Sequence, residues 1–412
     1  MESASVEHGD IEQLERKLNV LFVVSDPKSS PTISVHSNLM RFLNRDRVEV
    51  HVLYNRRAEA SVLDLLPNSP EVKLRPVEFG PVGRPRTFRQ VLSGARSLGP
   101  AIRDAVGVIG YARRNSIDVI HCEYSARNGT YGFLVSRLTR ARYIVHFHSK
   151  YGSWLSRLSR FAIGHADAII TVSGWTGRVM EREGGIPANR IFPVLNGIEV
   201  EKWDPSTVDE SAVRRELDLE VGDPLVVMVA QLTDWKRQSI AVEAFRRVVV
   251  EHPRSRLLLV GEEQATAIVP GVQSYTDRLH ELVAELGLER HVIFAGRRPD
   301  VREILAAADI FLLPSIDDPC PLAHIEAMAM ARPVVTVEAG GAPELVENGK
   351  SGLVGPVDDA EQVAANLIAL IDDPAKRSEL GRGGRRRVVE YLNAGRMADE
   401  VERVYRSISA SR

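Results

Sequence analysis

Two short stretches in the second half of the sequence carry side chains that could bind a charged, hydroxylated ligand. In the first stretch, Lys236 follows an apolar run that ends near Ala230, and it precedes a segment of helical periodicity. A lysine at the end of a strand is placed to neutralise a phosphate, because its ammonium group is a compact point charge. Taken alone, the pair Lys236 and Arg237 is more typical of a solvated helix start.

The second stretch joins an apolar strand, Ile310–Leu313, to a helix that we expect from about Pro321 to about Met330. The first backbone N–H groups of a helix have no intrahelical partner and, together with the helix dipole, they favour an anion. The phosphate site that this predicts is formed by Cys320, Pro321, Leu322 and Ala323.

Asp318 and Glu326 lie eight positions apart, the first before this helix and the second within it. Each carboxylate oxygen can accept a hydrogen bond from a separate hydroxyl, so carboxylates suit vicinal diols. The two residues therefore predict that an extended, hydroxyl-rich ligand is held at two points. The alternative for Glu326 is an ordinary solvated helix residue.

The elements that must position these side chains alternate along the whole chain. Runs rich in β-branched residues are separated by stretches of helical periodicity, which favours parallel sheets with helices on both faces. Such sheets bind ligands at the carboxyl ends of their strands. The expected strands are Val20–Val24, Val48–Leu53, Ile117–His121, Tyr143–Phe147, Ala168–Val172, Ile191–Val194, Leu225–Ala230, Arg256–Val260, Val292–Ala295, Ile310–Leu313, Pro333–Val337 and Gly352–Val354.

The length of 412 residues predicts more than one domain, since a single hydrophobic core rarely serves so long a chain. A polar, proline-containing stretch after Ile198 marks the boundary. We expect an N-terminal domain over residues 1–198 and a C-terminal domain over residues 199–412. Within the latter, residues 394–412 form an amphipathic helix that could pack back on the N-terminal domain.

The two halves of the chain carry opposite net charge. Residues 1–198 hold 27 Lys and Arg against 18 Asp and Glu, whereas residues 199–412 hold 26 against 37. A basic half favours an anionic ligand or an anionic membrane surface, and mutual attraction of two oppositely charged domains is an equal alternative. The same choice between a solvated face and an anion-binding surface applies to Arg84, Arg86, Arg89, Arg96 and Arg103.

Composition and motif spacing exclude several classes of protein. With 44% hydrophobic and 26% charged residues, the chain is neither disordered nor fibrous, and nothing predicts nucleic-acid binding. No apolar run reaches the roughly 18 residues that span a bilayer. We therefore expect a cytoplasmic protein, with peripheral contact at the inner membrane face as a further option. His146 and His148 share one face of a strand, but nothing in the sequence completes a three-ligand set, so we predict no metal site.

The motifs resemble, in order and spacing, those of a family of retaining GT-B glycosyltransferases, glycosyltransferase family 4. The family signature is E-x7-E followed by A-M-A-x-G-x-P-V-V, and this chain has Asp318-x7-Glu326 followed by AMAMARPVV. Further similar stretches are DVIHCEYS, VHFHS, ADAIITVSGWTGRVM and Asn196-Gly197 in the first half, and FAGRRPDVREILAAADIFLLPS and GGAPELVENGKSGLVGP in the second. The resemblance implies an α/β fold of GT-B architecture, with two Rossmann-like doubly wound parallel-sheet domains that face a cleft.

The resemblance also implies an activity. Members of the family transfer a sugar, with retention at the anomeric carbon, from a nucleoside-diphosphate sugar to an acceptor hydroxyl. We expect a hexosyltransferase that uses a UDP-sugar, needs no cofactor and no metal, and acts on a hydroxyl acceptor. An anionic or lipid-linked acceptor is one option, and the basic N-terminal half could then contact a membrane.

Matching positions carry the expected roles. Glu326 would bind the ribose hydroxyls and Asp318 those of the donor sugar, while Lys236 and the amides near Cys320–Ala323 would hold the pyrophosphate. The resemblance implies His148, Lys236 and Asp318 as catalytic residues. The remaining donor-side candidates are Gln231, Arg237 and Arg297, and the acceptor-side candidates are His148 and Ser173.

Three positions depart from the family pattern. Asp318 replaces a glutamate and is shorter by one methylene, Gln231 replaces an arginine five positions before Lys236, and Pro31-Thr32-Ile33-Ser34 replaces a Gly-Gly loop. Two alternatives therefore stay open. One is a catalytically weak, nucleotide-sugar-binding partner subunit, and the other is a different GT-B chemistry such as that of a phosphorylase or an epimerase.

Overall fold

The computed structural model describes residues 16–28, 30–67, 69–79, 99, 103–264 and 273–410. The chain forms two compact units, of which the first holds residues Met1–Leu195 and Ala394–Arg412 and the second holds residues Asn196–Asn393. Of the arginines considered as an anion-binding surface, Arg84, Arg86, Arg89 and Arg96 lie outside the described residues. No helix within the described ranges is long and apolar enough to cross a membrane.

The first unit is built on a seven-stranded sheet of order β3-β2-β1-β4-β5-β6-β7, in which all neighbouring strands are parallel. Its strands are β1 (Leu18–Val24), β2 (Val48–Asn55), β3 (Val72–Val77), β4 (Val119–Glu123), β5 (Arg142–Phe147), β6 (Ala168–Thr171) and β7 (Ile191–Pro193). Its helices include α2 (Pro31–Phe42), α3 (Ala60–Leu63), α5 (Ala126–Leu138), α6 (Arg157–Gly164), α7 (Gly174–Gly184), the short η1 (Ala188–Arg190) and α16 (Ala394–Ala410).

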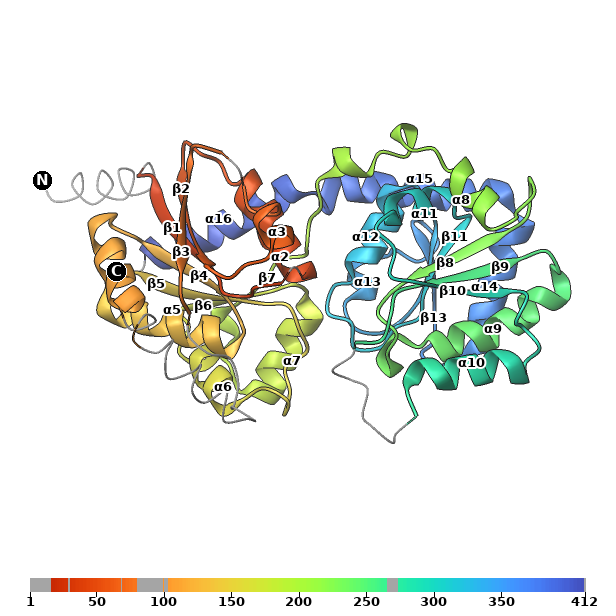
Figure 1. Cartoon of the computed structure of the whole chain (residues 1–412), viewed down its shortest axis with the longest axis horizontal. Helices are drawn as coiled ribbons and strands as arrows, with labels where there is room; N and C mark the ends of the chain where they lie inside the picture. The colour runs from red at the N-terminus through yellow and green to blue at the C-terminus, as the bar shows by residue number, and fades with distance from the viewer. Residues whose placement is uncertain are drawn as a thin grey trace, which may run out of the picture. The chain divides into compact units, whose positions relative to one another are not determined.

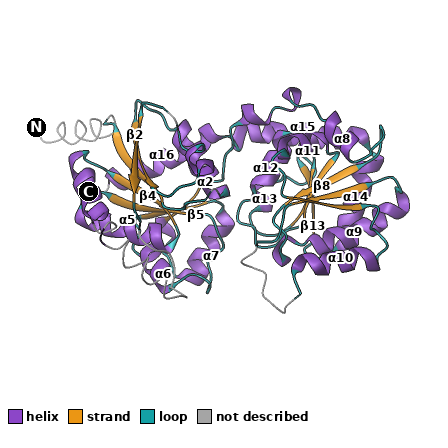
Figure 2. Ribbon diagram, in the orientation of Figure 1, coloured by secondary structure: helices purple, strands orange, loops and turns teal. Residues whose placement is uncertain are grey.

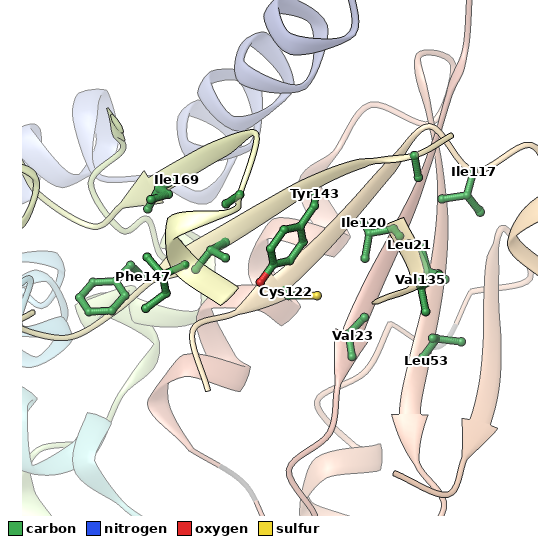
Figure 3. Close-up of a cluster of buried hydrophobic side chains, with 14 of the residues drawn as sticks. Leu21, Val23, Leu53, Ile117, Ile120, Cys122, Val135, Tyr143, Phe147 and Ile169 are labelled. Atoms are coloured by element: carbon green, nitrogen blue, oxygen red, sulfur yellow. The ribbon is translucent and has the colours of Figure 1, made fainter. Parts of the chain in front are cut away.

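The core of the first unit lies between this sheet and its helices. Figure 3 shows side chains of β1 and β4, such as Leu21 and Ile120, next to Tyr143 of β5, and all three are buried. Such burial contributes about 1.5–3 kcal/mol for each large apolar side chain. The strands of this sheet are therefore held in place by a packed apolar core.

The last helix, α16, packs against α2 and β6 of the first unit (Figure 1). Its apolar residues Met397, Val401, Val404 and Tyr405 recur at helical spacing and are buried. The chain therefore returns to its first sheet after completing the second unit.

The second unit is built on a six-stranded sheet of order β10-β9-β8-β11-β12-β13, again with all neighbouring strands parallel. Its strands are β8 (Leu225–Val229), β9 (Arg256–Val260), β10 (Val292–Gly296), β11 (Ile310–Leu313), β12 (Val334–Val337) and β13 (Gly352–Gly355). Its α-helices are α8 (Ser211–Glu216), α9 (Gln238–Glu251), α10 (Tyr275–Glu285), α11 (Val301–Ala307), α12 (Leu322–Ala329), α13 (Ala342–Leu345), α14 (Ala360–Asp372) and α15 (Pro374–Tyr391). Its short 3-10 turns are η2 (Val200–Trp203), η3 (Pro205–Thr207) and η4 (Asp234–Lys236).

Figure 2 shows helices on both sides of each sheet, as the alternating sequence pattern predicts. The prediction of two Rossmann-like parallel-sheet domains is confirmed. In each sheet the chain starts at an interior strand and adds strands toward one edge. It then returns to the other side of that first strand and adds strands toward the opposite edge. The direction reverses between β1 and β4 in the first unit and between β8 and β11 in the second, and such switch points are where open α/β sheets bind ligands.

One strand was not expected from the sequence. Strand β3 (Val72–Val77) pairs with β2 at the edge of the first sheet, and its sequence VKLRPV includes a proline. Only its two terminal valines are buried. An edge strand tolerates proline and exposed charges because one side of it forms no ladder hydrogen bonds, so its sequence lacks the apolar run that marks an interior strand.

Candidate functional site

The switch point of the second sheet holds an ion pair between Lys236 and Asp318. Lys236 follows β8 and Asp318 follows β11, and these two strands are neighbours. The Lys236 ammonium group donates a hydrogen bond to Oδ2 of Asp318. The side chains are only 13% and 8% exposed, so the two charges meet in a largely enclosed place.

Backbone contacts fix both partners of this pair. Ile316 N–H donates to the Trp235 carbonyl over 2.9 Å, which ties the two loops together. Gly341 N–H donates to the Asp318 carbonyl over 2.8 Å. Gly340 has a φ of +58°, and a Cβ there would lie 2.3 Å from the same carbonyl oxygen. Only glycine fits so close an approach in this conformation, so the loop after β12 presses directly on Asp318.

Helix α12 begins beside this ion pair with free backbone donors. Its N-cap residue is Pro321, and no side chain caps the helix. The N–H groups of Leu322 and Ala323 find no acceptor among the described residues. Asn196 donates from Nδ2 to the carbonyl of the buried Cys320 over 3.3 Å and so holds the loop before the helix. The helix therefore presents partial positive charge and unpaired amides.

Glu326 lies one turn further along α12, on the same face as Leu322. Part of its surface reaches solvent, yet the surrounding protein atoms raise the pKa of its carboxyl group from 4.5 to about 7 by desolvation. Its carboxyl group has no hydrogen-bond partner within the ranges that the structure describes. An enclosed acid without a protein partner is a good acceptor for ligand hydroxyls.

His324 is a residue of this region that sequence reasoning missed. It is fully buried on α12, and neither ring nitrogen has a partner among the described residues. Burial first, and then the charge of Lys236, lower the pKa of its imidazole to about 3. No motif marks it, because its burial follows from the packing of α12 against several elements of the second unit.

Within the described residues, no hydrogen bond or ion pair joins the other donor-side candidates to the side chains of the Lys236–Asp318 pair. Arg237 adopts a left-handed conformation and donates from two nitrogens to Asp358 over 2.7 and 3.2 Å. Gln231 lies near the pair in sequence, but its side-chain oxygen is 3.5 Å from Nε2 of Gln264. Arg297 is exposed after β10, two strands from β8.

The two candidates of the first unit lie in different surroundings. His148 follows β5, its Nε2 is 3.2 Å from Nε2 of His36, and burial lowers its pKa well below the usual value. Ser173 is fully buried and caps α7, accepting from Thr176 N–H over 3.2 Å. The assignment of Ser173 to the acceptor side stays a prediction.

Comparison with known proteins identifies the family. The model of the glycosyl transferases group 1 matches residues 209–387, and that of glycosyltransferase family 4 matches residues 35–202. The alpha-maltose-1-phosphate synthase of Mycobacterium tuberculosis is 30% identical over 270 residues, which is 63% of this chain and 67% of the relative. The chain belongs to glycosyltransferase family 4.

Further relatives of this family 4 glycosyltransferase agree. The alpha-maltose-1-phosphate synthase of Mycolicibacterium smegmatis is 29% identical and covers 82% of the chain and 92% of the relative. A crystal structure of Anabaena HepE in complex with UDP matches with a TM-score of 0.75 and 22% identity, over 95% of this chain and all of that one. The sucrose-phosphate synthase of Thermosynechococcus elongatus matches with a TM-score of 0.71 and 20% identity, over 96% and 100%. The predictions of an enzyme and of a GT-B fold are confirmed.

We predict that Glu326→Gln changes stability in a pH-dependent way. Because the folded-state pKa is raised, the unfolded chain ionises first, and Glu326 lowers stability as the pH rises from about 4.5 to about 7. At pH 5 the variant should melt at nearly the same temperature as wild type. At pH 8 it should melt at a higher temperature, and its free energy of unfolding should exceed that of wild type by at most about 3 kcal/mol.

Scanning calorimetry at both pH values measures this difference. Glu379→Gln, on the exposed face of α15, is the matched control and should shift the melting temperature equally at both. If the Glu326→Gln variant is no more stable than wild type at pH 8, desolvation does not raise the pKa of Glu326 and the prediction is wrong.

Proposed function

We propose that the chain transfers a sugar from a nucleoside-diphosphate sugar to an acceptor hydroxyl, with retention at the anomeric carbon and without a metal ion. The donor binds at the β8–β11 switch point. The observation that carries this proposal is the position of the Lys236–Asp318 pair, which lies beside the uncapped start of α12 in the same unit as the unpaired carboxyl group of Glu326.

The diphosphate is the part of the donor that this site suits best. Lys236 supplies a full positive charge, and the amides of Leu322 and Ala323 supply two free donors. An ammonium group has three N–H bonds, so Lys236 can donate to a phosphate oxygen while it remains paired with Asp318. When the glycosidic bond breaks, negative charge grows on the β-phosphate, and fixed donors of this kind stabilise it.

Glu326 suits the ribose of the nucleoside. Two vicinal hydroxyls donate to the two oxygens of one carboxylate. Such hydrogen bonds favour the ionised form and so offset the desolvation that raises the Glu326 pKa to about 7. The energy that Glu326 costs the free protein is thereby recovered when the donor binds.

Retention follows from same-face attack in this proposal. The bond from the anomeric carbon to the β-phosphate oxygen breaks, the acceptor oxygen bonds to that carbon on the same face, and the acceptor proton passes to the departing phosphate. Asp318 does not act as a nucleophile, because its carboxylate is engaged by Lys236. Asp318 instead binds donor hydroxyls through its remaining acceptor capacity, and His148 acts on the acceptor side.

A UDP-sugar is the first donor to test. Anabaena HepE is described in complex with UDP and with UDP-glucose. A thermal-shift screen against UDP, GDP, ADP and their sugars tests the proposal, since a ligand that binds only the folded state raises the melting temperature. We expect UDP to stabilise the protein, and Glu326→Ala to remove that stabilisation while Glu379→Ala retains it.

A second outcome of the screen would redirect the proposal. If GDP or ADP alone stabilises the protein, the donor carries a nucleoside other than uridine, and the proposed binding site stays the same. Absence of any shift with all nucleotides, in a protein that melts cooperatively, would argue against a nucleoside-diphosphate donor.

We predict that Lys236→Ala lowers kcat more than donor affinity. The lysine charge is used most as the bond breaks, so its removal should cost about 100-fold in kcat, and a smaller factor in the dissociation constant of the donor. Steady-state kinetics and calorimetry measure the two quantities. Lys350→Ala is the control, because Lys350 is exposed and its one ion pair among the described residues is with Glu347. Equal losses in kcat and in donor affinity would contradict the prediction and would show that Lys236 contributes only to donor binding.

We predict that transfer activity survives brief exposure to EDTA. Lys236 and the α12 amides stabilise the diphosphate leaving group, so no Mg²⁺ or Mn²⁺ is needed at the donor. Initial rates with and without chelator check this. Loss of activity that Mg²⁺ or Mn²⁺ alone restores would contradict the prediction.

A further inference from the structure

Three buried histidines meet in the first unit. His36 comes from α2, His121 from β4 and His146 from β5, and each is buried. The centroid of each ring lies 5.2 Å from the centroids of the other two. The fold thus assembles a near-equilateral triangle of imidazoles from three elements that are distant in sequence.

The hydrogen bonds of the cluster leave nitrogen capacity unused. Nδ1 of His121 contacts the Tyr405 hydroxyl over 2.7 Å, and Nε2 of His121 lies 3.2 Å from Nδ1 of His146. Nε2 of His146 is buried and has no partner among the described residues. A buried polar atom without a partner is unfavourable, and a bound ligand would satisfy it.

We propose that His36, His121 and His146 bind a divalent transition-metal ion, with Zn²⁺ the first candidate. One possible ligand nitrogen from each ring lies within 4.8 Å of those of the other two. Around a tetrahedral ion with bonds of about 2.0–2.1 Å, ligand nitrogens stand about 3.4 Å apart and ring centroids about 5 Å apart. The triangle already has this size, and small rotations of the rings bring the nitrogens together.

The chemistry of the ligands selects the metal. The three ligands are neutral imidazoles without thiolate or carboxylate, a set that suits Zn²⁺, Cu²⁺, Ni²⁺ and Co²⁺ and disfavours Mg²⁺ and Ca²⁺. His121 offers Nε2, because its other nitrogen is held by Tyr405. A ligating histidine usually donates a hydrogen bond from its second ring nitrogen, and this bond fixes the tautomer and the orientation of the ring.

The ion has a structural role in this proposal. It joins α2 to the two central strands β4 and β5, and through Tyr405 it reaches α16. His148 lies next to the cluster, with its Nε2 3.2 Å from Nε2 of His36 and its ring centroid 4.1 Å from that of His146. The proposal does not rest on the nucleotide donor, because all three histidines belong to the first unit.

Metal analysis of the tag-free wild-type chain tests the proposal without an activity assay. After exchange into metal-free buffer, mass spectrometry should find about one zinc per chain. Removal with a strong chelator should lower the melting temperature, and Zn²⁺ should restore it. Titration of the apoprotein with Co²⁺ should give the intense visible bands of a four-coordinate ion, saturating at one equivalent.

Variants locate the site. His36→Gln and His146→Gln should each lose the bands, whereas His165→Gln, an exposed histidine of the same unit, should keep them. If wild type retains no metal, and its apoprotein shows neither cobalt bands nor stabilisation by Zn²⁺, the cluster is held by hydrogen bonds alone and the proposal is wrong. Loss of the bands in His165→Gln would place the ion at the surface and also overturn it.

Discussion

The ion pair between Lys236 and Asp318 is the interaction on which the proposed chemistry depends. Taking two charges out of water costs several kcal/mol per ion, and a hydrophobic pair of similar size is often as stable. The pair is therefore poorly explained as a stabilising feature of the fold. A site that must place one positive charge beside a developing phosphate charge, with no solvent to rearrange, explains it better.

The fold makes this pair possible through the order of its strands. Lys236 and Asp318 are 82 residues apart, yet they follow neighbouring strands because the chain winds outward through β9 and β10 before it returns to β11. Gly340 then allows a third loop to reach the Asp318 backbone. The catalytic chemistry proposed for the second unit thus rests on parallel-sheet topology and on one glycine, and the family assignment is consistent with both.

The sequence predicted the repetitive parts of the structure well. Interior strands are continuous apolar runs and were found within a few residues of their bounds, as β9 and β11 illustrate. The start of α12 was also predicted, because proline and the apolar periodicity mark it. Edge strand β3 was missed, because an edge strand does not need a continuous apolar run.

Side-chain partners could not be predicted in the same way. Arg237 follows Lys236 in sequence, but its left-handed backbone directs it to Asp358. The histidine triangle was missed because His36 belongs to a helix and His121 to a different strand from His146. Such contacts join residues that are distant in sequence, so they become visible only when the folded structure is known.

Hydrogen exchange measured by mass spectrometry, with and without saturating UDP, tests the central claim most directly. The method identifies the segments whose backbone amides exchange more slowly when the nucleotide is bound. We predict protection in residues 230–237 and 314–326, the two loops that meet at the Lys236–Asp318 pair. Binding of UDP that protects other segments and leaves these two unchanged would contradict the account.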